Sequence, residues 1–162
     1  MKVIIIMGSK ADKDWSEKIA AGLHQLNIPV VMRIASAHKV PLKVLEIIQE
    51  YEAEEVVFIT VAGRSNALSG FVDAQTIRPV IACPPYSDKF GGGDIFSSLR
   101  MPSGVAPLVI LEPEAAALAA AKILALKNET LAEAIKIYQE KKKSALDKDD
   151  RQLLQEQKKS IS

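Results

Sequence analysis

The segment Ser36-Ala37-His38-Lys39 places an imidazole beside a lysine and is the first part of this chain that could do chemistry. An unperturbed histidine has a pKa of about 6.5, so His38 could take up and return a proton at neutral pH. Lys39 is either a surface charge or a cation for an anionic ligand. A lone histidine often has only a structural role, so both interpretations of His38 stay open here.

A second polar segment, Ala62-Gly63-Arg64-Ser65, follows an apolar run and is continued by Asn66 and Ser69. Either Ser65 or Asn66 could cap a helix that begins at this point. Capping needs only one such residue, whereas this segment offers several hydrogen-bonding side chains. The excess favours ligand binding.

The turn Gly8-Ser9-Lys10-Ala11-Asp12 is a third candidate. Glycine allows the backbone to approach a ligand closely, and the start of a helix offers free N–H groups and positive potential to a phosphate. The alternative is a plain turn in which Asp12 caps the next helix. The turn matches neither the G-x-G-x-x-G nor the G-x-x-x-x-G-K-[ST] pattern, which argues against those modes of nucleotide binding.

The elements that position these turns alternate between strands and helices. Continuous apolar runs predict buried parallel strands at Val3–Met7, Val30–Ala35, Val56–Val61, Pro79–Cys83 and Leu108–Leu111. Helical spacing and start signals predict helices after Asp12, after Pro41, and over Asn66–Ala74, Ile95–Arg100, Glu114–Leu126 and Glu129–Ala145. This alternation predicts an α/β fold with three layers (α/β/α) around a parallel sheet in the flavodoxin-like strand order.

Open parallel sheets bind ligands beyond the carboxyl ends of their strands. The three polar turns follow the first three predicted strands, and a fourth, Pro84–Asp88, follows the fourth strand. This fourth turn opens a glycine-rich segment, Pro84–Asp94, which we expect to be mobile. We therefore expect four turns to converge on one crevice, with His38 at the end of a central strand.

Length and composition predict one domain over residues 1–162, without nucleic-acid or membrane partners. A formal net charge of +1 lacks the basic excess of a nucleic-acid-binding protein. No apolar run approaches the roughly 20 residues of a membrane span. The single cysteine, Cys83, excludes an internal disulfide and a multi-cysteine zinc site; it fits the cytoplasm and is expected to pack as a small apolar side chain. The charged tail after Ala145 is expected to fray or to lie on a neighbouring subunit.

The chain resembles the PurE family of purine-biosynthesis enzymes, which handle carboxylated aminoimidazole ribonucleotide. The resemblance covers nearly the whole chain and rests on the segments MGSKAD, SAHK, AGRSNALSG and SSLRMPSG. The third turn and Lys39 are similar to the second class of the family, which carboxylates 5-aminoimidazole ribonucleotide directly with carbon dioxide, without ATP, biotin or metal. The first class isomerises the N-carboxy compound and typically shows AGGAAHLPG there, usually with arginine after the histidine.

The resemblance implies a role for each matching position and no cofactor or metal. It implies that the ribonucleotide is held by Ser9, Asp12, Ser36, Lys39, Gly63 and Ser65. His38 would shuttle the proton at the ring carbon that gains the carboxylate, and the third turn would shape the carbon dioxide pocket. Ala11 departs from the family, which often has serine there, so a possible hydroxyl ligand of the phosphate is missing.

The resemblance also implies a homo-oligomer, which the alanine-rich helix and the charged tail suggest independently; a tetramer and an octamer are both open. Two other functions remain as alternatives. One is the N-carboxyaminoimidazole ribonucleotide mutase activity of the first class. The other is a non-enzymatic, flavodoxin-like module that binds a nucleotide or flavin. A receiver domain would need an acidic cluster where only Asp12 is present, and a flavodoxin phosphate loop would be richer in serine and threonine than GSKADKD.

Overall fold

The computed structural model describes residues 1–160 and contains one sheet of five parallel strands. The strands are β1 (Lys2–Met7), β2 (Val30–Ile34), β3 (Val56–Val61), β4 (Val80–Ala82) and β5 (Leu108–Val109). Their order across the sheet is β2-β1-β3-β4-β5, and all neighbouring pairs are parallel. The predicted flavodoxin-like order is therefore confirmed.

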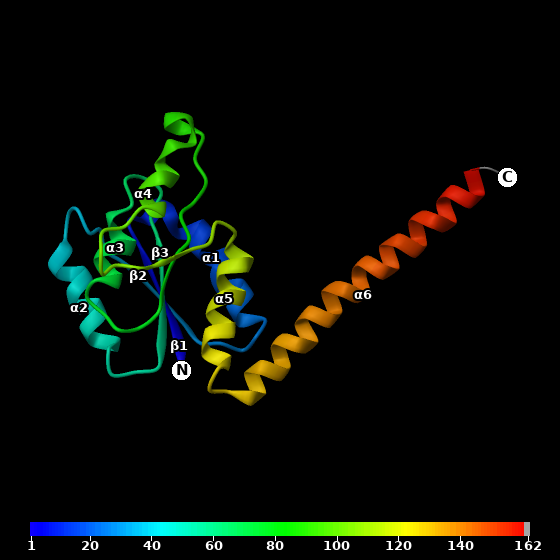
Figure 1. Cartoon of the computed structure of the whole chain (residues 1–162), viewed down its shortest axis with the longest axis horizontal. Coiled ribbons are helices and arrows are strands. Elements are labelled where there is room, and N and C mark those ends of the chain that lie inside the picture. Colours follow the sequence, from blue (N-terminus) through cyan, green and yellow to red (C-terminus); the bar gives the residue numbers. More distant parts are fainter. Residues whose placement is uncertain (161–162) are drawn as a thin grey trace.

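Helices cover both faces of this sheet (Figure 1). The helical elements are η1 (Lys10–Asp12), α1 (Lys13–His24), α2 (Pro41–Tyr51), α3 (Ala67–Asp73), η2 (Lys89–Ile95), α4 (Phe96–Leu99), α5 (Pro113–Ala125) and α6 (Glu129–Ser160). Helices α1 and α5 lie on one face, and α2 and α3 lie on the other. The predicted three-layer arrangement is confirmed.

Alternation along the strands divides the core between the two faces. In β1, Val3 and Ile5 face the cluster of α1 and α5, whereas Ile4 and Ile6 face the cluster of α2 and α3. Both sides of the strand are buried, so every position needs an apolar side chain. This is why the strand appears in the sequence as a continuous apolar run.

Small residues let α1 and α5 approach each other closely. A Cβ atom added at Gly22 of α1 would lie only 2.8 Å from the Cβ of Ala117 in α5. Both residues lie where the two helices meet, and Ala117 is buried. The alanine-rich composition of α5 thus has a structural role within the chain.

The second strand differs from its prediction. β2 ends at Ile34 and is an edge strand, so His38 lies in a turn beyond an edge strand and not at the end of a central one. Arg33 is the sequence signal for this, because a charged side chain inside a strand is tolerated only where water is near. Its guanidinium pairs with Glu50 of α2 at 2.6 Å.

The last helix also differs from its prediction. α6 continues to Ser160, so the segment after Ala145 is neither frayed nor separate, and residues 161 and 162 of the predicted tail lie outside the described residues. Between 129 and 160 the chain has no glycine or proline that would stop a helix. In Figure 1, α6 starts beside α5 and projects away from the sheet. No helix within residues 1–160 has both the length and the apolar character that a bilayer crossing requires.

Candidate active site

One cavity of about 600 Å³ lies beyond the carboxyl ends of β1 to β4. Its lining includes every site residue predicted from the sequence: Ser9, Asp12, Ser36, His38, Lys39, Gly63 and Ser65. The first, second and third turns contribute these residues, and the fourth contributes Pro85, Tyr86 and Ser87. The expected convergence of four turns is therefore found.

The first turn is held by mutual hydrogen bonds between Ser9 and Asp12. The carboxylate of Asp12 accepts from the backbone N–H of Ser9 at 2.8 Å and from its hydroxyl at 3.1 Å. Ser9 Oγ accepts in turn from the backbone N–H of Ala11 at 3.2 Å. Asp12 occupies the cap position of α1 but makes no side-chain capping bond there, so the prediction that it caps this helix is wrong in that respect. The carboxylate instead fixes the turn that faces the cavity.

The second turn presents His38 and Lys39 without binding their side chains to the protein. The backbone is closed by bonds from Lys39 N and Val40 N to Ser36 O, at 3.2 and 2.9 Å. Both His38 and Lys39 are exposed and line the cavity. Within residues 1–160 no protein atom hydrogen-bonds the imidazole, so its nitrogens are available to a ligand.

The third turn divides its polar residues into two groups. Arg64 and Ser65 line the cavity, whereas Asn66 and Ser69 are buried outside it. The interpretation of this excess as ligand binding therefore fits only the first two. Packing favours glycine at position 63, because a Cβ there would make a tight contact of 3.0 Å with Pro85 Cγ.

Sequence analysis missed Lys89, which reaches the cavity from the glycine-rich segment. Together with Lys39 and Arg64 it gives the lining three cationic side chains against one carboxylate, Asp12. In the part of the chain that the structure describes, none of these three cations forms a salt bridge. The cavity is therefore suited to an anion. The sequence signal for Lys89 was its position two residues before three consecutive glycines.

Cys83 takes no part in this site. It is a buried free thiol, as expected, and burial raises its pKa to about 11. A thiol with so high a pKa is not a nucleophile at neutral pH. Over residues 1–160 no group of three or more histidine, cysteine, aspartate or glutamate side chains is placed to hold a metal ion.

The fold and the cavity together define a class: a doubly wound α/β protein with a basic, histidine-containing site at the switch point of its sheet. Comparison with known families narrows this class. The AIR carboxylase family matches residues 2–145 of the chain. The chain belongs to this family, the PurE enzymes of purine biosynthesis.

Individual relatives agree with the family assignment. The phosphoribosylaminoimidazole carboxylase of Archaeoglobus fulgidus is 67% identical over 153 residues, which cover 94% of this chain and 85% of that protein. The crystal structure of PurE from Treponema denticola superimposes with a TM-score of 0.91 at 49% identity, covering 93% of this chain and 97% of that one. A bifunctional carboxylase and synthetase of Drosophila melanogaster is 47% identical over 128 residues, which are 78% of this chain and 30% of that protein. Membership of an enzyme family sets aside the non-enzymatic, flavodoxin-like module.

Proposed function

We propose that this enzyme carboxylates 5-aminoimidazole ribonucleotide with carbon dioxide, giving the 4-carboxy product without ATP, biotin or metal. The observation that carries the proposal is the meeting of His38 with the third turn in one basic cavity. Relatives from Archaeoglobus fulgidus and Treponema denticola are both named phosphoribosylaminoimidazole carboxylase, which supports the reaction. The third turn, with the sequence GRSN, supports the direct use of carbon dioxide through its resemblance to the second class.

Binding of the ribonucleotide fixes the position of the reacting ring. We assign this role to Ser9, Asp12, Ser36, Lys39, Gly63 and Ser65, which line the cavity. Anchoring through the distant phosphate orients the ring carbon and lowers the barrier by avoiding a bimolecular encounter. Because Ala11 offers no hydroxyl, the phosphate relies on backbone N–H groups and cationic side chains instead.

The chemical step joins the electron-rich ring carbon to carbon dioxide. The new carbon–carbon bond displaces an electron pair onto oxygen, which produces a carboxylate, and the ring carbon then loses its hydrogen as a proton to His38. Lys39 and Arg64 can stabilise the new negative charge. The backbone N–H groups of residues 63–65 can contribute too, because within residues 1–160 they donate to no protein acceptor.

A direct assay separates this reaction from the mutase alternative. The purified enzyme is incubated with aminoimidazole ribonucleotide and bicarbonate, without ATP, and the carboxylated product is measured. Efficient conversion at low bicarbonate is expected. Turnover of the N-carboxy isomer alone would instead assign the first-class mutase activity. Varying carbonic anhydrase in the same assay identifies whether carbon dioxide or bicarbonate is taken up.

We further propose that the enzyme is a cytoplasmic homo-oligomer, either a tetramer or an octamer. One face of α6 packs on the body through Leu131 and Ile135, and the same helical face continues through Leu146 and Leu153. The latter two leucines are exposed, although they lie on a stripe that is buried at its other end. A helix that leaves the body in this way gains its stability from a partner. For the location, the single buried thiol of Cys83 suits a reducing compartment.

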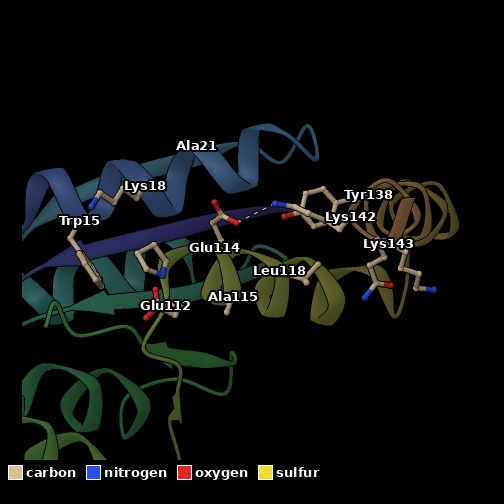
Figure 2. A pocket seen from close by; sticks show the side chains of 12 residues that line it. Trp15, Lys18, Ala21, Glu112, Glu114, Ala115, Leu118, Tyr138, Lys142 and Lys143 are labelled. Atoms are coloured by element: carbon tan, nitrogen blue, oxygen red, sulfur yellow. Dashed lines mark ion pairs between the residues drawn. The ribbon is translucent and has the colours of Figure 1, made fainter. Parts of the chain in front are cut away.

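A groove between α1, α5 and α6 is suited to receive the end of a second α6. Figure 2 shows Trp15, Leu118 and Tyr138 along this groove of about 870 Å³. Lys142 pairs with Glu114 at 3.6 Å across it, and further lysines, Lys18 and Lys143, line its wall. The projecting part of α6 carries leucines together with Asp147, Asp149 and Asp150. The same part also carries Lys148, Arg151, Lys158 and Lys159, so its charge is not one-sided. The apolar side chains on both surfaces are what supports a second copy of this chain as the occupant.

A further inference from the structure

Asn66 is a buried residue at the junction of the third turn and α3. Its side chain is 4% exposed, and its carbonyl oxygen accepts from Ser69 N at 3.3 Å. Its amide nitrogen donates to the hydroxyl of Ser98 at 2.8 Å. Both polar groups of the side chain, the amide nitrogen and the oxygen, are thus bonded to the protein and are not available to the substrate.

The backbone of Asn66 makes a second bond to the same helix. Its N–H donates to Ser97 Oγ at 2.8 Å, and the Ser97 hydroxyl donates in turn to Asp94 O at 2.7 Å. Asp94 is the last residue of the glycine-rich segment, which lines the cavity through Tyr86, Ser87 and Lys89. Two walls of the cavity, far apart in sequence, are therefore joined through one asparagine and two serines.

The third turn needs such support because its backbone is strained. Ser65 has a φ of 41°, in the left-handed region that side chains other than glycine adopt only at a cost in free energy. A strained conformation persists where its surroundings determine it. The bonds of the next residue, Asn66, to Ser97 and Ser98 supply that constraint, since Ser98 is itself only 1% exposed and fixed in α4.

We propose that Asn66, Ser97 and Ser98 form a latch that holds the third turn in its strained conformation and couples it to the glycine-rich segment. These three are positioning residues, because none of them lines the cavity. The latch keeps the free N–H groups of residues 63–65 and the side chain of Arg64 directed at the site where the new carboxylate forms. The kinetic part of this inference rests on the proposed function, whereas the structural part does not.

The two halves of the cavity should respond differently when the latch is opened. Ser9, Asp12, Ser36 and Lys39 belong to the first and second turns, which make no hydrogen bond to the latch in the part of the chain that the structure describes. Four of the six residues assigned to the ribonucleotide therefore stay in place, and only Gly63 and Ser65 move with the third turn, so the affinity should weaken by no more than about tenfold. The carboxylation step depends on the third turn, and a displacement of about 1 Å there costs on the order of 100-fold in rate. A merely structural role would not lower the rate of carboxylation so much more than the affinity for the ribonucleotide.

Ser98→Ala tests the latch, because it removes one hydroxyl and adds no bulk. Ser98→Thr keeps the hydroxyl and serves as the conservative rescue. Ser69→Ala is the matched control, since the Ser69 hydroxyl is equally buried in the same region but has no hydrogen-bond partner among residues 1–160. Hydrogen–deuterium exchange is measured on the full chain without substrate, for peptides covering residues 62–68 and 84–95. Steady-state kinetics with aminoimidazole ribonucleotide and bicarbonate follow on the same samples.

Ser98→Ala should raise exchange in both peptides together, lower kcat by on the order of 100-fold and raise the KM for carbon dioxide. The Kd for the ribonucleotide should rise much less, by no more than about tenfold. Ser69→Ala should change none of these, and Ser98→Thr should restore them in part. Exchange that rises in one peptide only, or in neither, overturns the coupling. Faster exchange in both peptides with unaltered kinetics overturns the positioning role.

Two further observations keep the inference separate from the proposed function and from misfolding. If the unaltered enzyme does not carboxylate the ribonucleotide, the proposed function fails, and the exchange data still decide whether the latch exists. If Ser98→Ala does not fold, Ser97→Ala opens the other bond and is measured in the same way. In the double variant Asn66→Ala/Ser98→Ala, losses should be no larger than in Asn66→Ala alone, because both changes open the same bond. Additive losses would contradict the latch.

Discussion

Side chains around the cavity divide into those already bonded to the protein and those left free. Ser9 and Asp12 hydrogen-bond each other, so changing either one alters the first turn as well as any ligand contact. His38, Lys39 and Arg64 have no such bonds within residues 1–160. Substitutions at these three positions should therefore report on ligand binding and chemistry with little effect on folding.

His38→Asn should abolish turnover while the fold and ribonucleotide binding persist. Asparagine keeps a polar side chain of similar size but cannot take up a proton, so kcat should fall by about 100- to 10,000-fold. Rapid-quench or steady-state assays give kcat, and calorimetry gives the Kd for the ribonucleotide. The exposed residue His24, on the outer surface of α1, provides the control His24→Asn, which should behave as the unaltered enzyme. Near-normal turnover of His38→Asn would remove His38 from the mechanism.

Lys39→Ala should weaken ribonucleotide binding by about tenfold, the loss expected for one charge-assisted hydrogen bond to an anion. Lys39 lines the cavity and has no carboxylate partner among the described residues, so its charge is free for the ligand. Titration calorimetry at two salt concentrations measures the effect, which should shrink at the higher salt. Lys127→Ala removes an exposed lysine outside this cavity and is the control. An unchanged Kd for Lys39→Ala would contradict the assignment.

At the scale of elements, the apolar and polar pattern of the sequence predicted the central strands correctly. The runs Val3–Met7 and Val56–Val61 are buried on both faces, and the topology rule for parallel sheets then predicted where the polar turns meet. The predicted flavodoxin-like order already places β2 at the edge of the sheet, so the prediction of a central strand before His38 was inconsistent with it. The latch could not be predicted from local sequence, since Asn66 and Ser98 are 32 residues apart and meet only in the folded chain.

Gly22→Val should destabilise the fold at the α1–α5 contact. Even the first added carbon would lie 2.8 Å from Ala117 Cβ, and both helices are fixed by the sheet beneath them. Overpacking of this kind costs about 1–3 kcal/mol, more than the small gain in helix propensity over glycine. Urea unfolding at constant protein concentration measures the change. Lys122→Val, on the exposed side of α5 and outside the groove lining, should cost less than about 1 kcal/mol. Equal effects at both positions would exclude close packing as the cause.

At the scale of the whole molecule, contacts within a single chain do not explain why the second half of α6 extends into solvent. From residue 141 to 159 every residue is exposed, including Leu146 at 71% and Leu153 at 54%. The sequence predicted a helix only as far as Ala145 because the apolar spacing weakens after that point. Its continuation follows from helix propensity. Because helices in proteins gain most of their stability from packing, its exposed length agrees with the partner surface that we propose.

Leu153→Asp combined with Leu154→Asp should therefore reduce the oligomer to a smaller species. Two charges would replace the exposed leucines that we propose to dock in the groove of a second copy, and burying them there is unfavourable. Light scattering coupled to gel filtration should give a tetrameric or octameric multiple of 17.6 kDa for the unaltered chain and a lower mass for the variant. Gln155→Asp adds a charge on the opposite side of α6 from Leu146 and should leave the mass unchanged.

Leu118→Glu tests the groove that we propose as the docking site, and it should lower the mass as well. If the leucine variant lowers the mass and Leu118→Glu does not, the end of α6 docks elsewhere. A monomeric unaltered chain would contradict the oligomer itself.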